Sequence, residues 1–456
     1  MAADDTNLTL DLALRVGELL LSSGAGAADT AATMLSITYA CGLRDCEVDV
    51  TFTSLEISYQ PSADAPSQTR MRQLRFRAVD YTRLTETDQL VTALIVGAVD
   101  RDEARSRLAT MVSSPHRYPR WAVSLGWGVM AVGASLLIGG DALVALIALI
   151  SALIADQMLR VMARRRLPAF YQQVAGGLLA TLIAVGASAT PVGVDPSLAI
   201  SAGIITMLAG IAFVGAVQDA LTGYYVTAGA RGLEAILLTG GIIAGVSGGL
   251  AVADRFGVPI YATPLTSEWS ELAQVLIGAA ITSAAFAFAS YAPIRSLLPV
   301  ALVGVLGTLV YRLLVSYAFG YAWSTAVAAV LIGVVAYSLA GRFRVPSLVV
   351  VVCGITPLLP GLSIYRGLYL LADGSTLGLI ALATALAIAL ALASGVILGE
   401  YIAQPLKREA RRLEQRLAGP RLIGPWGPSS VRRARRRRHG SISARRPTDD
   451  APSGSG

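Results

Sequence analysis

The sequence is nearly free of lysine, because Lys407 is the only one in the chain. A phosphate-binding P-loop needs a lysine directly after its glycines, so that the ammonium group reaches the β- and γ-phosphates. No stretch of this chain meets that requirement, which excludes a P-loop ATPase within the polypeptide. If the chain transports a solute, we expect the energy to come from another source.

Charged residues are also scarce, at 15% of the 456 residues, whereas hydrophobic residues make up 54%. Soluble domains average about 25% charged residues. The apolar residues fall into runs close to 20 residues long, which is the length of helix that crosses the hydrocarbon of a bilayer. The composition therefore predicts a mainly α-helical membrane protein with several spans.

Cysteine and histidine are too few for a recognisable metal site. Cys41, Cys46 and Cys353 show no CxxC spacing, and the chain has only two histidines. Zinc sites need such ligands in closely spaced pairs. We interpret the cysteines as small apolar residues and expect no metal and no cofactor.

The first 118 residues contain no membrane-length apolar run and predict a small cytoplasmic α+β head. Helical spacing of apolar residues predicts helices over 6–22, 27–41, 87–99 and 102–112. Alternating and β-branched residues predict a strand over 47–59 and an edge strand over 71–80.

A serine pair closes the first predicted helix, in the sequence Ser22-Ser23-Gly24-Ala25. A nucleophilic serine needs a nearby base, but the head has no lysine and its one histidine, His116, lies at its far end. Turn chemistry favours a helix that simply ends at glycine. A membrane-anchored hydrolase acting through Ser23 is thus the weakest functional hypothesis.

Ten membrane spans follow the head. They are expected at about 121–140, 142–162, 171–190, 197–218, 233–253, 271–291, 296–314, 321–340, 346–370 and 376–399. Arginine-rich loops, with Arg231 counted among their residues, alternate with acidic loops. The Lys/Arg rule then places head and tail on the cytoplasmic side of a bacterial inner membrane.

Two stretches of the membrane region resist an explanation by packing alone. Residues 203–239 place Gln218 and Asp219, and then Arg231 and Glu234, at the edge of apolar sequence. Ionisable groups in such positions face a protein interior or a water-filled cavity.

The second stretch, residues 352–371, contains Pro357, Pro360 and Gly361, followed by Arg366. Prolines break a helix, and broken helices often build the substrate sites of secondary transporters. A structural kink with Arg366 reaching outward to the interface has equal weight.

With no usable histidine in the spans, carboxylates are the plausible proton carriers, and Asp156 and Asp219 are the candidates. For Asp156 the alternative is an ion pair with Arg160, four residues further along the same helix face.

The ten spans divide into two five-span blocks, the first membrane block (residues 119–255) and the second membrane block (residues 256–403). The two unusual stretches occupy comparable positions in their blocks. Since five spans reverse the direction of the chain, the second block would be inverted relative to the first. An inverted repeat places the binding site between its two halves.

The tail, residues 404–456, contains 14 Lys and Arg against 4 Asp and Glu, a balance of +10. We interpret it as a disordered basic arm that lies against anionic lipid rather than nucleic acid, because it is tethered beside a membrane. The sequence leaves the oligomeric state open, a homo-oligomer included.

The chain resembles the bacterial threonine/serine exporter family along nearly its whole length. The matching features are LLLSSGA (19–25), the run 42–58, Gly215, Asp219, Gly223, Arg231, Glu234 and ThrProLeuLeuProGly (356–361). The family often carries Pro-Gly where this chain has Val214-Gly215. The resemblance therefore does not predict a sharp break at that point of the fourth span. The resemblance implies a cytoplasmic head, two five-span blocks and export of threonine and serine driven by the proton-motive force.

The leading hypothesis is therefore a secondary exporter of small amino acids with proton antiport, and not an enzyme. Split relatives of the family are associated with succinate export. The alternative is thus a dicarboxylate exporter, in which Arg231 and Arg366 hold the anion.

Overall fold

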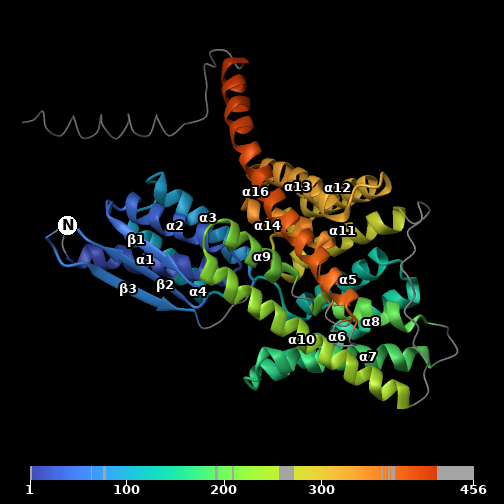
Figure 1. Ribbon diagram of the computed structural model, residues 1–456. Coiled ribbons are helices and arrows are strands. Elements are labelled where there is room, and N and C mark those ends of the chain that lie inside the picture. Colours follow the sequence, from blue (N-terminus) through green and yellow to red (C-terminus); the bar gives the residue numbers. More distant parts are fainter. Residues whose placement is uncertain are drawn as a thin grey trace, which may run out of the picture. The chain divides into compact units, whose positions relative to one another are not determined.

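The computed structural model describes residues 3–417, apart from 63, 75–78, 190–193, 208–209, 256–271, 361–362, 365, 368–369 and 371–374. It is mainly helical, with one three-stranded sheet near the N-terminus (Figure 1). The chain divides into two compact units, Met1–Pro405 and Leu406–Gly456. The basic arm expected in the tail lies almost entirely outside the described residues.

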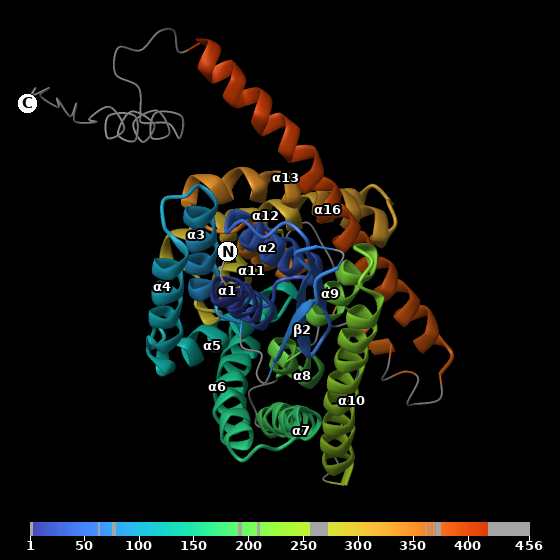
Figure 2. The ribbon, with the colours of Figure 1, turned by 90° about the vertical axis from the view of Figure 1, so that its left-hand side faces the viewer.

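The head combines four helices with the sheet. Its elements are α1 (Ala3–Ser22), α2 (Ala27–Ala40), β1 (Cys46–Val50), β2 (Ser54–Tyr59), β3 (Gln68–Gln73), α3 (Tyr81–Ile95) and α4 (Arg101–Ser113). The strands pair antiparallel in the order β1-β2-β3, and α1 and α2 pack against them (Figure 2). Leu10, Met34, Leu55 and Ile57 are fully buried in this core. The helices expected over 6–22, 27–41 and 102–112 are confirmed.

Three local predictions for the head were wrong in detail. The expected single strand over 47–59 is the hairpin β1–β2, because the Thr51 hydroxyl accepts a hydrogen bond from the Ser54 amide (3.0 Å) and closes a turn. The expected edge strand over 71–80 is β3, which ends at Gln73. Helix α3 begins at Tyr81 rather than Thr87, because the Asp80 side chain caps it by accepting from the Arg83 amide (3.0 Å).

Apolar helices of different lengths form the membrane region. They are α5 (Arg120–Leu137), α6 (Ala142–Arg164), α7 (Ala169–Ser188), α8 (Pro196–Ile204) with η1 (Ile205–Met207), α9 (Gly210–Leu221), α10 (Tyr225–Arg255), α11 (Leu272–Ala289), α12 (Ile294–Ser316), α13 (Tyr321–Phe343), α14 (Ser347–Ile355) with η3 (Thr356–Leu358), and α16 (Leu377–Leu417). Among the described residues, eight helices are long and apolar enough to cross a membrane, or nine if one bent pair counts as a single span.

The bent pair lies where the fourth span is expected. The segments Pro196–Met207 and Gly210–Leu221 differ in direction by 49°. The change of direction therefore precedes Val214-Gly215, the position at which the family often carries Pro-Gly. The ninth expected span is represented by the shorter apolar segment Ser347–Leu358 and by a following stretch that is described only in part.

Helix α10 begins at Tyr225, eight residues before the expected start of the fifth span. Arg231 is thus a helical residue, and it is buried. Counting it as a loop cation in the topology argument was wrong. The helix extends further because its first turns lie against the head, where Thr227 donates a hydrogen bond to the Val50 carbonyl (3.0 Å).

Helices α7 and α10 pack in direct backbone contact through glycines. A Cβ added at Gly177 would lie 2.6 Å from the carbonyl oxygen of Ile242, and one added at Gly245 would overlap the carbonyl oxygen of Val174. Glycines on both helices thus allow the close approach of the two backbones.

We predict that Gly245→Ala lowers the free energy of unfolding by about 1–3 kcal/mol, because the added methyl group forces the two backbones apart. The matched control is Gly248→Ala on the same helix, where nothing lies within 4 Å of an added Cβ. Thermal unfolding of both variants in detergent tests this, and equal midpoints would contradict the packing argument.

Candidate functional site

The site is built on helix α2, which begins without a capping side chain of its own. After α1 the chain turns at Gly24 (φ +98°), and Gly26 takes the N-cap position in extended conformation. Glycine has no side-chain oxygen to offer the first turn of the helix. The backbone N–H of Ala27 instead donates to Oδ1 of Asp219 (3.0 Å), a residue of α9 that lies 192 positions further along the chain.

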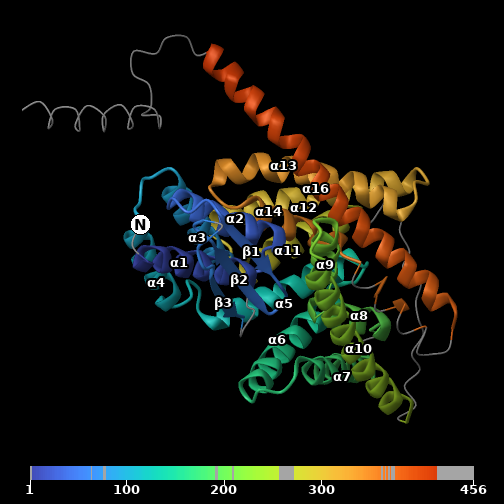
Figure 3. The ribbon, with the colours of Figure 1, turned by 60° about the vertical axis from the view of Figure 1, so that its left-hand side comes forward.

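Asp219 is 1% exposed and forms a buried ion pair. Its Oδ2 lies 3.0 Å from Nη1 of Arg231 on α10. Its two oxygens thus bind a helix N-terminus and a guanidinium group, both of which favour the ionised carboxylate. Figure 3 shows α9 and the start of α10 beside the strands and α2 of the head.

Gly215 makes this ion pair possible. It lies four residues before Asp219, on the same face of α9, and a Cβ added there would come within 2.8 Å of Nη1 of Arg231. The guanidinium therefore rests on the bare backbone of α9. This gives a physical reason for glycine at a position that sequence reasoning had linked only to a family pattern.

A tight turn joins α9 to α10 and fixes both partners. Gly223 adopts φ +92°, and the Tyr224 amide donates to the carbonyl of Asp219 (2.9 Å). Since Thr227 is bound to Val50 of the head, both sides of this turn are attached to the head. Asp219 and Arg231 are therefore held by three elements, α2, α9 and α10.

Two further carboxylates gather around α2. Asp29, in its first turn, lies within Coulombic range of Asp219 and of Glu400 on α16, and Glu400 is hydrogen-bonded to Ser347. Asp29 is exposed, yet desolvation by the protein on its other side raises its pKa above the ordinary value, and the charge of Asp219 raises that pKa further.

Sequence reasoning did not select Asp29. The available signal was an acidic residue in the first turn of a helix that directly follows a glycine-rich turn.

The other predicted residues of the first membrane block lie apart from this centre or at its rim. Gln218 is half-buried beside Asp219, and Glu234 is half-buried on α10. Asp156 binds Arg160, which also donates to the Ser124 hydroxyl (2.6 Å). The alternative interpretation of Asp156, an ion pair on one helix face, is therefore the one that the structure shows.

The predicted break in the ninth span is present. Helix α14 ends at Ile355, Pro357 lies in the short helix η3, and Leu359 leaves the helical conformation (φ −63°, ψ 135°). Pro360 is buried, and η3 packs against α11 and α12. Gly361 lies outside the described residues, and Arg366 is exposed. The bend thus belongs to the interior of the second membrane block.

The head gives no support to the hydrolase hypothesis. Ser23 is 2% exposed, and the Ser22 hydroxyl donates to the Leu19 carbonyl. His116 is bound to Asp80 (2.9 Å) and stacks on Tyr291. Within the described part of the chain, no group of three His, Cys, Asp or Glu side chains could hold a metal ion.

Comparison with known proteins gives one consistent family. Residues 11–253 match the model of the family "Putative threonine/serine exporter", and residues 275–402 match "Threonine/Serine exporter, ThrE". The chain is 37% identical over 438 residues to a "Probable threonine/serine exporter" of Mycobacterium tuberculosis, which covers 94% of this chain and 82% of the relative. It is 36% identical over 410 residues to a "Threonine/serine exporter" of Corynebacterium glutamicum, covering 88% and 84%. No solved structure matches the chain.

We predict that Arg231→Gln lowers the free energy of unfolding by about 3–5 kcal/mol, because it leaves the Asp219 carboxylate charged, buried and without its guanidinium partner. The double variant Arg231→Gln/Asp219→Asn should recover part of this loss. Arg255→Gln, at the exposed far end of α10, is the control. Thermal unfolding measures these variants together with Asp219→Asn alone, and strictly additive losses of the two single variants would contradict the pairing.

Proposed function

This chain belongs to the threonine/serine exporter family, and on that premise we propose that it exports threonine and serine across the bacterial inner membrane by secondary transport. The observation that carries the proposal is the buried pair of Asp219 and Arg231 in an otherwise apolar helical bundle. Buried charges in membrane helices are costly, and they commonly mark pathways for substrates or ions.

The proposed architecture has four parts: the head (1–118), two five-span membrane blocks (119–255 and 256–403) and a basic tail (404–456). The bent pair and the broken ninth segment complete ten spans. Head and tail lie in the cytoplasm, as the arginine bias of the loops favours, and the basic arm lies on anionic lipid.

Helix directions support an inverted repeat. The equivalent first helices of the two blocks, α5 and α11, run antiparallel, because Gly126 faces Ala289 while Gly133 faces Thr282. The third and fifth helices run parallel in each block. In the first block Phe170 faces Gly241 and Val174 faces Gly245; in the second, Ala326 faces Gly395 and Val330 faces Gly399. An inverted repeat requires the same helix directions within each block, and opposite directions for the equivalent helices of the two blocks.

Arg231 suits a substrate that is a zwitterion. A guanidinium binds a carboxylate with two parallel hydrogen bonds, and the neighbouring carboxylates suit an α-ammonium group. In the structure Arg231 is occupied by Asp219. The α-ammonium group of the substrate would bind the ionised Asp219 carboxylate, and protonation of Asp219 would release it. Proton entry and amino-acid export would then compete for one group, which is the essence of antiport.

Transport by reconstituted protein tests this mechanism. In proteoliposomes preloaded with labelled threonine, an inward proton gradient should accelerate efflux by the wild-type protein. In Asp219→Asn the gradient should no longer change the rate of efflux, because the amide cannot cycle a proton. Asp254→Asn, an exposed carboxylate of the same block, is the matched control and should retain the response.

Efflux that ignores the gradient in both wild type and Asp219→Asn would remove the antiport mechanism. Slowing of threonine efflux by succinate inside the vesicles would favour the dicarboxylate alternative.

A further inference from the structure

The head is attached to both membrane blocks. On the first block, Ala27 donates to Asp219, and Thr227 donates to Val50. On the second block, the Tyr81 amide donates to the Ser290 carbonyl (3.0 Å), the Thr82 hydroxyl to the Tyr291 carbonyl, and the Gln89 side chain to the Arg344 carbonyl (3.1 Å). The head therefore bridges the two halves whose relative movement would open a path between them.

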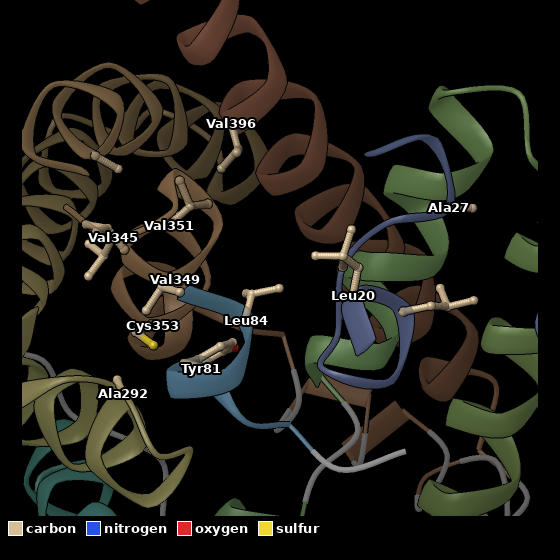
Figure 4. Close-up of a cluster of buried hydrophobic side chains, with 14 of the residues drawn as sticks. Leu20, Ala27, Tyr81, Leu84, Ala292, Val345, Val349, Val351, Cys353 and Val396 are labelled. Carbon is tan, nitrogen blue, oxygen red and sulfur yellow. The ribbon is translucent and has the colours of Figure 1, made fainter. Parts of the chain in front are cut away.

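The attachment to the second block is apolar and uses backbone groups. Tyr81 is 3% exposed, and its ring meets that of Phe286 edge-on (6.4 Å between centroids). Figure 4 shows Tyr81 and Leu84 beside Val349 and Cys353 of α14. Hydrogen bonds from amide and hydroxyl groups to backbone carbonyls do not depend on a protonation state, and neither does apolar burial. This side of the bridge is thus a permanent anchor.

The attachment to the first block depends on the charge of one residue. The Asp219 carboxylate binds Arg231 through one oxygen and the start of α2 through the other. Among the described residues, the charged or titratable groups around it include Arg231 from α10, Tyr224 from the turn and Asp29 from α2, with Glu400 of α16 beyond Asp29. Loss of the carboxylate charge weakens both of its bonds at once.

We propose that the start of α2 is the head-side gate of the transport path, closed while Asp219 caps it and opened when Asp219 is protonated. The head then swings away from the first block while Tyr81 keeps it anchored on the second. This inference rests on the proposed function, since it assigns the head a place in the same transport cycle. It also explains why the glycine-rich turn 22–26 lacks a capping side chain: the cap comes from the membrane helix.

One substitution removes only this bond. Ala27 is the first residue of α2, where proline is well tolerated, and Gly26 already has the extended conformation (φ −68°, ψ 157°) that precedes proline. Ala27→Pro deletes the N–H and places a ring carbon against Asp219. Ala142→Pro is the matched control, because Ala142 is the exposed first residue of α6 and the Asp141 cap binds the amides of Leu143 and Val144 instead.

In the threonine efflux assay, Ala27→Pro should raise gradient-independent efflux roughly ten-fold, since a hydrogen bond to a charged group no longer closes the gate. Ala142→Pro should behave as wild type. Equal gradient-independent efflux by the two proline variants would overturn the gate.

Hydrogen exchange of the full-length protein tests the movement without reference to any substrate. Protection factors of residues 26–30 should fall on acidification in the wild type and be low at every pH in Asp219→Asn, while residues 81–85 stay protected. Unchanged protection at 26–30 would overturn the gate. Absence of threonine efflux by the wild type, with this exchange pattern intact, would instead overturn the proposed substrate and leave the head movement standing.

A cross-link supplies a second route if Ala27→Pro fails to fold. With the native cysteines replaced by alanine, Asp49→Cys/Tyr224→Cys joined by a short bifunctional reagent fixes the head to the first block, because both positions reach solvent and lie near each other. Efflux should stop on cross-linking and return with a cleavable reagent after cleavage. Undiminished efflux by cross-linked protein would contradict a gate that must open.

Discussion

A carboxylate that is buried in an apolar bundle needs hydrogen-bond or ionic partners in place of water. Asp219 binds such partners from two different parts of the chain. Arg231 comes from the next helix, and the Ala27 amide comes from the head. Neither partner alone would satisfy both oxygens of the carboxylate. The requirement for both is what ties the head, α9 and α10 into one structural unit, and the turn at Gly223 and the bare backbone at Gly215 serve the same arrangement.

The rest of the membrane region follows a different rule. There the helices hold together through small residues that let backbones touch, as between α7 and α10 or between α13 and α16. Such contacts fix distance and direction but carry no charge. Packing therefore shapes the two blocks, whereas the polar centre at Asp219 joins the first block to the head.

Much of the fold could be predicted from the sequence, because membrane helices are recognised by their length and apolar composition. The helices near 142–162 and 321–340 follow directly from that rule, and α1 and α2 follow from helical spacing. Turns were harder: the hydroxyl of Thr51 divides one β-rich stretch into two strands, and the cap at Asp80 starts α3 early. These are single hydrogen bonds, which composition and periodicity do not encode.

The site was predicted in part. Asp219 and Arg231 stood out as charged residues in apolar sequence. The second partner of Asp219, the Ala27 amide, could not be found, because a backbone amide carries no signal in a sequence. A contact across 192 positions depends on the complete fold. Asp156 illustrates the opposite case, since a partner four residues away on the same helix is visible in the sequence and is the one it binds.

The missing cap of α2 has a consequence for how the protein is made. The head leaves the ribosome first, yet the residue that completes its second helix is synthesised 192 positions later. At ordinary bacterial and eukaryotic elongation rates the delay is about 10–40 s. During that interval the first amide of α2 lacks its carboxylate partner, so this contact between the head and α9 forms only after Asp219 has been made.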